Sequence, residues 1–145
     1  MSLASITETY VNSFNETDID GVMEFFHPEC VYVTLQGPEI RGYNAIREEF
    51  AQQFKGKLGD LRFPIEERIF DEAKQIAVIT WDCVHDLAPP PTRNLSLGFL
   101  ARVMRVLFGT KVRWHGLDVL HFKDGKIIRK STFGKTPYPA MSRVR

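Results

Sequence analysis

The segment VRWHGLDVLHFKDGKIIRKSTFG, residues 112–134, has the pattern of a β-hairpin with one charged residue on its apolar face. Asp124 and Gly125 favour a tight turn between two antiparallel strands, because both residue types tolerate positive φ. Side chains of a strand alternate between its two faces, so Asp118 shares a face with Trp114. We therefore predict a hairpin whose buried face contains a single carboxylate.

A carboxylate at Asp118 would lose much of its hydration, so donors must satisfy its charged form or it must carry a proton. Two structural explanations compete with a functional one. The residue could lie at an edge open to water, or it could accept hydrogen bonds from backbone amides. If no cation lies beside it, we expect the neutral form, which can donate a hydrogen bond.

The composition is that of one globular domain, 1–145, because 145 residues with 43% hydrophobic content are enough to bury a core. A net charge of +1 argues against nucleic acid as a partner. Two cysteines, Cys30 and Cys83, cannot form a disulfide framework and suggest a reducing, cytoplasmic location. We expect no signal peptide and no membrane span, because the sequence has no long apolar run.

The first part of the chain predicts three helices. SITE, residues 5–8, has the spacing of a capping box and predicts a helix over 5–15. TDID, residues 17–20, repeats the signature and opens a short helix that Pro28 closes, and a third helix is expected over 44–54. The apolar stripes of the first and third helices are spaced by four residues and comprise Ile6, Tyr10, Phe14, Ile46, Phe50 and Phe54.

Strands dominate the rest of the chain. Segment 30–35 is β-branched and aromatic, 61–70 alternates but contains Pro64, which suggests an edge or a bulge, and 75–87 is apolar enough to be a central strand. Helices followed by antiparallel strands indicate an α+β domain with the helices on one face of a sheet.

An insertion, 88–110, separates two strands that a short turn could have joined. Three prolines open it, and 96–108 then reads as a helix with an unusually wide apolar surface. Such a helix needs a cover, so it could be a lid over a cavity, a subunit contact or a membrane-surface patch.

These motifs resemble the nuclear transport factor two-like superfamily, also called SnoaL-like. The segment YVNSFNETDIDGVMEFFHPECVYV is similar to the family's opening, GYNAIREEF to its third helix and GLDVLHFKDGKI to its penultimate hairpin. The resemblance implies a cone formed by a strongly curved antiparallel sheet, with three N-terminal helices on its concave face, here with a helical insertion. It also implies a homodimer that binds a small hydrophobic molecule. Ketosteroid isomerases, polyketide cyclases, dehydratases and non-enzymatic proteins share this fold, so the fold does not choose a reaction.

The resemblance to ketosteroid isomerase assigns roles to individual residues. Tyr10 falls at the oxyanion-hole tyrosine, and Asp118 at the oxyanion-hole aspartic acid or, by similarity to the cyclases, at a general acid/base. Thr34 falls where the isomerase has its base, and a hydroxyl without an activating partner cannot abstract a carbon-bound proton. His85 is a candidate substitute base. The structural alternatives are a core tyrosine at Tyr10 and a solvated strand-end histidine at His85.

The leading hypothesis is an enzyme that enolises a hydrophobic carbonyl compound, as isomerase, cyclase or dehydratase, with Asp118, Tyr10 and His85 as catalytic residues. The residues expected to line its pocket are Phe14, Phe26, Thr34, Phe54, Trp81, Ser131 and Phe133. No cofactor is expected, because the sequence has no phosphate-binding glycine loop, and no metal, because His115 and His121 are weak candidates. The alternative is a ligand-binding or assembly module without chemistry. A weaker third hypothesis, resting on basic residues in 102–113 and at the C-terminus, is a membrane-surface or nucleic-acid adaptor.

Overall fold

The computed structural model describes residues 2–55, 60–86, 103, 106–107, 109 and 111–135. Its helices are α1 (Leu3–Asn15), α2 (Ile19–Met23) and α3 (Tyr43–Phe54). Its strands are β1 (Phe26–Val33), β2 (Glu39–Arg41), β3 (Asp60–Arg62), β4 (Ile65–Asp71), β5 (Ile76–Asp86), β6 (Lys111–Lys123) and β7 (Lys126–Lys135).

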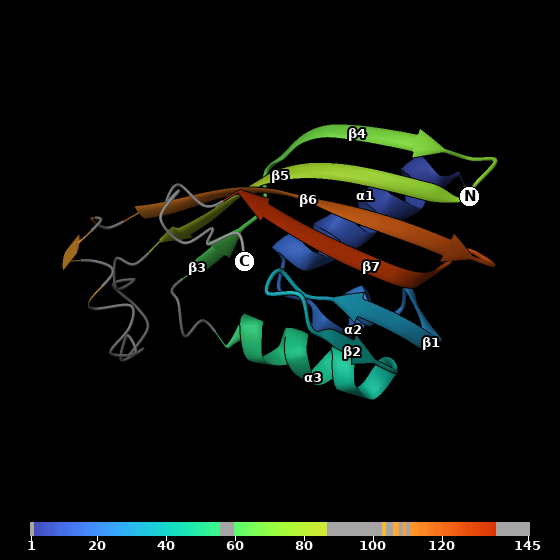
Figure 1. Ribbon diagram of the computed structural model, residues 1–145, viewed down its shortest axis with the longest axis horizontal. Helices are drawn as coiled ribbons and strands as arrows, with labels where there is room; N and C mark the ends of the chain where they lie inside the picture. Colours follow the sequence, from blue (N-terminus) through green and yellow to red (C-terminus); the bar gives the residue numbers. More distant parts are fainter. Residues whose placement is uncertain are drawn as a thin grey trace, which may run out of the picture.

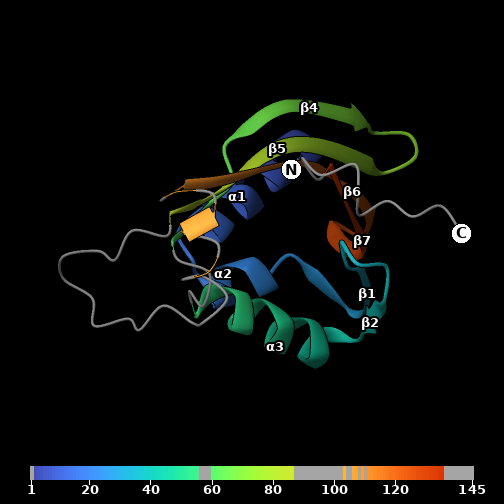
Figure 2. The same cartoon turned by 60° about the vertical axis from the view of Figure 1, so that its left-hand side comes forward.

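The strands form one sheet in the order β2-β1-β7-β6-β5-β3, with β4 also paired to β5. Only the β1–β7 pair is parallel among these described strands. The sheet curves around the helices, so that α1 lies inside the curve and α3 runs beside β1 and β2 (Figures 1 and 2). The prediction of an α+β fold with a strongly curved sheet and helices on one side is confirmed.

Helix α1 begins two residues earlier than the sequence predicted. Ser2 is the N-cap, and its side chain accepts a hydrogen bond from the backbone N–H of Ser5 at 3.2 Å. The capping-box interpretation of residues 5–8 was therefore wrong, because an earlier serine offers the same cap and lengthens the helix. The predicted apolar stripe is correct for Ile6 and Tyr10, which are buried.

Helix α2 is shorter than predicted, and strand β1 begins earlier. Asp18 caps the helix by accepting from Gly21 N–H at 3.0 Å, and the helix ends at Met23. Pro28 lies inside β1 and does not end a helix. It is tolerated there because the pairing of β1 with β7 shifts register between Phe26 and Val31, where a ladder donor is not required.

The predicted strand 61–70 is two strands, β3 and β4, that both pair with β5. Pro64 separates them, as its missing N–H suggested, and its carbonyl accepts a hydrogen bond from Asp82 N–H at 3.1 Å. The prediction that β5 is central is confirmed by its pairing with β3, β4 and β6.

The predicted insertion lies largely outside the described residues, so its helix over 96–108 stays a prediction, as do its roles as lid, subunit contact or membrane-surface patch. Within the part of the chain that the structure describes, no helix is long and apolar enough to cross a membrane.

Candidate functional site

Asp118 lies on the inner face of the sheet, toward the helices, and is only 6% exposed. Its cross-strand partners are Ile79 on β5 and Thr132 on β7, and Leu120 follows on the same face of β6. The residue is thus surrounded by the apolar interior, as the alternation of its strand predicted. It does not lie at an edge open to water.

A β-bulge in β7 determines which residues face Asp118. Phe122 pairs with Ile127, whereas His121 pairs with Arg129, so Ile128 has no partner across the hairpin. Beyond this extra residue the register is shifted by one, and a shift of one residue exchanges the two faces of a strand. The bulge therefore places Lys130 and Thr132 on the inner face.

Both carboxylate oxygens of Asp118 accept hydrogen bonds from β7. The ammonium of Lys130 donates to Oδ2, and Thr132 Oγ1 donates to Oδ1 at 2.6 Å. Lys130 is 4% exposed, so the two residues form an ion pair within the core. Of the two alternatives open for Asp118, donors that satisfy its charged form or a neutral carboxyl, the structure supports the first, because both oxygens accept hydrogen bonds and one of the donors is a cation.

Two tyrosines complete this polar group. The Lys130 Nζ atom lies 5.9 Å from the ring centroid of Tyr10 and 5.7 Å from that of Tyr32. Burial raises the pKa of Tyr32 to about 12, although hydrogen bonds with the side chains of Thr132 and Gln53 oppose this rise. Burial, and next the charge of Asp118, hold the pKa of Tyr10 well above its usual value. Both hydroxyls thus keep their protons and can act as donors.

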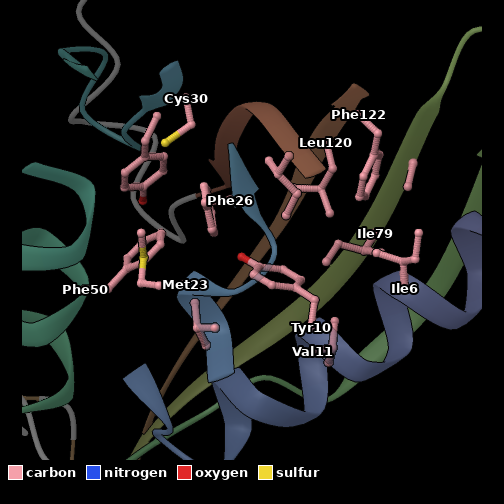
Figure 3. Packing of buried hydrophobic residues seen from close by; sticks show 14 of the residues in the cluster. Ile6, Tyr10, Val11, Met23, Phe26, Cys30, Phe50, Ile79, Leu120 and Phe122 are labelled. Carbon is pink, nitrogen blue, oxygen red and sulfur yellow. The ribbon is translucent and has the colours of Figure 1, made fainter. Parts of the chain in front are cut away.

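Aromatic side chains surround the polar group. Tyr10 lies in the middle of the buried cluster, near Phe26 and Ile79 (Figure 3). Its ring is 6.1 Å from those of Phe14 and Phe26, and the Phe14 ring is 5.0 Å from that of Phe54. The structure therefore brings together Tyr10 and three of the aromatic residues predicted to line a pocket.

Trp81 joins the same face through β5, opposite Gly116 of β6. Its ring packs so closely over the glycine that a Cβ atom there would lie 2.3 Å from the Trp81 Cη2 atom. Trp81 is 6% exposed, yet its Nε1 has no hydrogen-bond partner among the residues that the structure describes. Most buried donors are satisfied, so this N–H is a candidate contact for a ligand.

The structure contradicts the expected positions of Ser131 and Phe133. Ser131 pairs with Val119 and Phe133 with Leu117, on the outer face of the sheet, and Phe133 is 55% exposed. The cause is the bulge at Ile128, because a hairpin without it would have turned these residues inward.

Thr34 and His85 do not join Asp118. Thr34 is half-buried in the turn after β1, where its backbone N–H donates to the carbonyl of Pro38 at 3.0 Å. His85 pairs with Leu61 and Val112, six positions along β5 from Ile79, which is opposite Asp118. Six residues of a strand span about 20 Å. The backbone register thus places the predicted substitute base far along β5 from the position opposite Asp118.

Sequence reasoning missed Lys130, Thr132 and Tyr32. The signal that could have found Lys130 is the requirement that a buried carboxylate have a cationic or donor partner, applied to the neighbouring strand of the hairpin. The bulge itself left no mark in the sequence that a turn rule would detect. Among the described residues, the one grouping of His, Asp and Glu that could hold a metal lies elsewhere, on the outer face, and comprises Glu66, Asp82 and His115.

The sequence matches a family model described as a SnoaL-like domain over residues 7–130. No curated protein matches the chain. Many solved structures share the fold, and three of them illustrate the low sequence identity. A putative ketosteroid isomerase from Kribbella flavida has a TM-score of 0.65 at 14% identity, covering 94% of this chain and 79% of its own. A putative polyketide cyclase from Xanthomonas campestris has a TM-score of 0.64 at 14% identity, covering 90% and 88%. The epoxide hydrolase/cyclase-like enzyme SalBIII, which acts in pyran ring formation in the polyether salinomycin, has a TM-score of 0.69 at 17% identity, covering 92% and 91%.

Proposed function

The chain belongs to the SnoaL-like domain family, and from that premise we propose that it is an enzyme that enolises a hydrophobic carbonyl compound. The reaction class is that of an isomerase, cyclase or dehydratase working with side chains alone. The observation that carries the proposal is the buried group of Asp118, Lys130 and Thr132 on the inner face of the sheet.

A buried ion pair is better evidence for a catalytic or binding role than for a contribution to the stability of the fold. Each of two charges loses several kcal/mol of hydration free energy when it is buried, and their mutual attraction is of roughly the same size. Apolar residues of similar volume therefore often give a fold of equal stability. Asp118 and Lys130 are 6% and 4% exposed within an aromatic core. Ionisable groups in such surroundings are candidates for functional sites.

In the proposed reaction the Asp118 carboxylate is the base. It removes a proton from the carbon next to a substrate carbonyl, so that the C–H bond breaks, an O–H bond forms on Asp118, and the electron pair moves onto the carbonyl oxygen. The Lys130 ammonium and the Tyr10 hydroxyl stabilise the enolate oxygen, where a single well-placed donor contributes on the order of 3 kcal/mol. Asp118 then returns the proton to a different carbon, which restores the carboxylate.

The surrounding residues would hold the substrate. Phe14, Phe26 and Phe54 supply apolar surface. The Trp81 N–H, which has no partner in the described part of the chain, offers a second polar contact that fixes orientation. Thr34 lies in a turn and offers no carboxylate. Among the residues that the structure describes, Asp118 is the carboxylate placed beside Tyr10, which supports its assignment as the base.

The test is exchange of α-hydrogens for deuterium, followed by NMR, in a panel of hydrophobic ketones first shown to bind. We expect wild-type protein to promote exchange, and Asp118→Asn to reduce the rate by about 100-fold or more while affinity stays within about tenfold. Asp124→Asn, in the exposed turn of the same hairpin, is the matched control and should exchange at the wild-type rate.

Absence of exchange by wild-type protein with ketones that bind would reject the enzyme and leave the ligand-binding module. Exchange that persists in folded Asp118→Asn would reject the assignment of the base. Far-UV circular dichroism of each variant shows whether a loss of exchange reflects unfolding.

A further inference from the structure

We propose that Glu66, Asp82 and His115 form a binding site for a divalent transition-metal ion of the Zn²⁺ type on the outer face of the sheet. The ligand atoms of these three side chains all lie within 4.8 Å of one another. The site lies on the face opposite Asp118 and is separate from the proposed chemistry of the interior.

Three strands converge to form this cluster. Asp82 of β5 pairs directly with His115 of β6, so their side chains leave the sheet on the same face. Glu66 of β4 falls at a register shift, because Ile65 pairs with Trp81 whereas Glu67 pairs with Thr80. Such a bulge redirects a side chain, and here it brings a second carboxylate toward Asp82.

The contact between Asp82 and His115 supports this assignment. Asp82 is 7% exposed, and no described residue forms a hydrogen bond of regular geometry with its buried Oδ1 atom. That oxygen nevertheless contacts Nδ1 of His115. A carboxylate oxygen and a neutral imidazole nitrogen both present lone pairs, and a cation bound between them would satisfy both.

The other carboxylate oxygen is already occupied. Oδ2 of Asp82 lies 3.4 Å from Nη1 of Arg113, which leaves Oδ1 for a metal. The two carboxylates outweigh the single guanidinium, so the cluster keeps a net negative charge when His115 is neutral. A divalent cation would reverse that charge. It would bind one buried ligand, Asp82, and two accessible ligands, Glu66 and His115.

The ligand set selects the class of ion. One imidazole with two carboxylates suits Zn²⁺ and related transition metals, whereas Mg²⁺ prefers oxygen ligands alone and retains its water. Glu66 is exposed, and the side chain of His115 is 56% exposed, so solvent can complete the coordination. A bound ion would join β4, β5 and β6 at the bulge.

The test is isothermal titration calorimetry of ZnCl₂ into the full chain, prepared without a polyhistidine tag and freed of metal with a chelator. We expect one Zn²⁺ per chain and no comparable binding of Mg²⁺. Glu66→Gln and His115→Gln should each weaken Zn²⁺ affinity by about tenfold or more. His121→Gln is the matched control, since His121 is on the same face of the same strand and should bind Zn²⁺ like the wild type.

The proposal is overturned if wild-type protein binds no Zn²⁺, if Glu66→Gln and His115→Gln keep wild-type affinity, or if His121→Gln loses as much as His115→Gln. Asp82→Asn should also lose binding, but Asp82 is buried and this variant could fail to fold. Glu66 and His115 are exposed, so their variants keep the experiment decisive.

Discussion

Asp118 and Asp82 are two aspartates on adjacent strands that are almost equally buried, at 6% and 7% exposed, on opposite faces of the sheet. Both oxygens of Asp118 accept hydrogen bonds, from Lys130 and Thr132, within the interior. Asp82 has Arg113 at 3.4 Å from one oxygen, and its other oxygen contacts Nδ1 of the exposed His115 without a regular hydrogen bond. Burial alone therefore does not decide whether a carboxylate can bind a ligand. The hydrogen bonds that its two oxygens already accept decide this.

The largest effect is expected from removing the cation of the inner pair. Lys130→Met leaves a buried carboxylate without its counter-charge, which should lower the free energy of unfolding by about 3–5 kcal/mol. Arg129→Met is the matched control on the neighbouring residue, because Arg129 faces outward and pairs with Glu39 at the surface. This variant should lose less than about 1 kcal/mol. Urea unfolding followed by circular dichroism measures both values.

The double variant Asp118→Asn, Lys130→Met tests why Lys130→Met lowers the free energy of unfolding. If the uncompensated charge is responsible, the double variant should be more stable than Lys130→Met alone. Equal losses for Lys130→Met and Arg129→Met would contradict the distinction between the two faces.

A second prediction concerns the alkaline stability that the inner tyrosines confer. Burial raises the pKa of Tyr32 to about 12, whereas a tyrosine in the unfolded chain ionises near pH 10. The folded state thus holds this proton longer, and the stabilisation is complete below pH 10 and lost as the pH rises toward 12. The loss should be about 2–3 kcal/mol between these pH values.

Tyr32→Phe should therefore show a shallower decline than wild type when the free energy of unfolding is measured by urea titration at pH 9, 10 and 11. Absorbance at 295 nm should show that this variant lacks part of the ionisation seen above pH 11. Parallel declines in the two proteins would place the Tyr32 hydroxyl in contact with water.

The smallest effect compares two glycines that pair with each other, Gly116 and Gly134. A Cβ atom at Gly116 would lie 2.3 Å from the Trp81 ring and 2.6 Å from the carbonyl of Phe133, whereas one at Gly134 would meet only the flexible Leu35 side chain, at 2.4 Å. Gly116→Ala should cost about 1–3 kcal/mol and Gly134→Ala clearly less. Thermal unfolding compares them, and equal costs would mean that Trp81 does not pack on Gly116.

The sequence predicted the elements well and their register poorly. Helical stripes such as Ile6 and Tyr10 and the alternation around Asp118 depend on local spacing, and both placed residues on the correct face. The positions of Ser131 and Phe133 depended on a bulge, which no local pattern reveals. The partners of Asp82 depended on pairing between distant strands. Homodimerisation stays a prediction because it depends on a second chain.

The extra residue at Ile128 also bears on how this fold can change over time. Deletion of Ile128 would remove the bulge but keep the pairing of His121 with Arg129 and of Asp118 with Thr132, so the interior residues would stay the same. Loss of the bulge with Ile128 retained would instead shift the register by one, and Arg129, Ser131 and Phe133 would then face the interior in place of Lys130 and Thr132. The hairpin turn can thus stay the same while the presence of one unpaired residue decides which side chains of β7 face Asp118 and its neighbours.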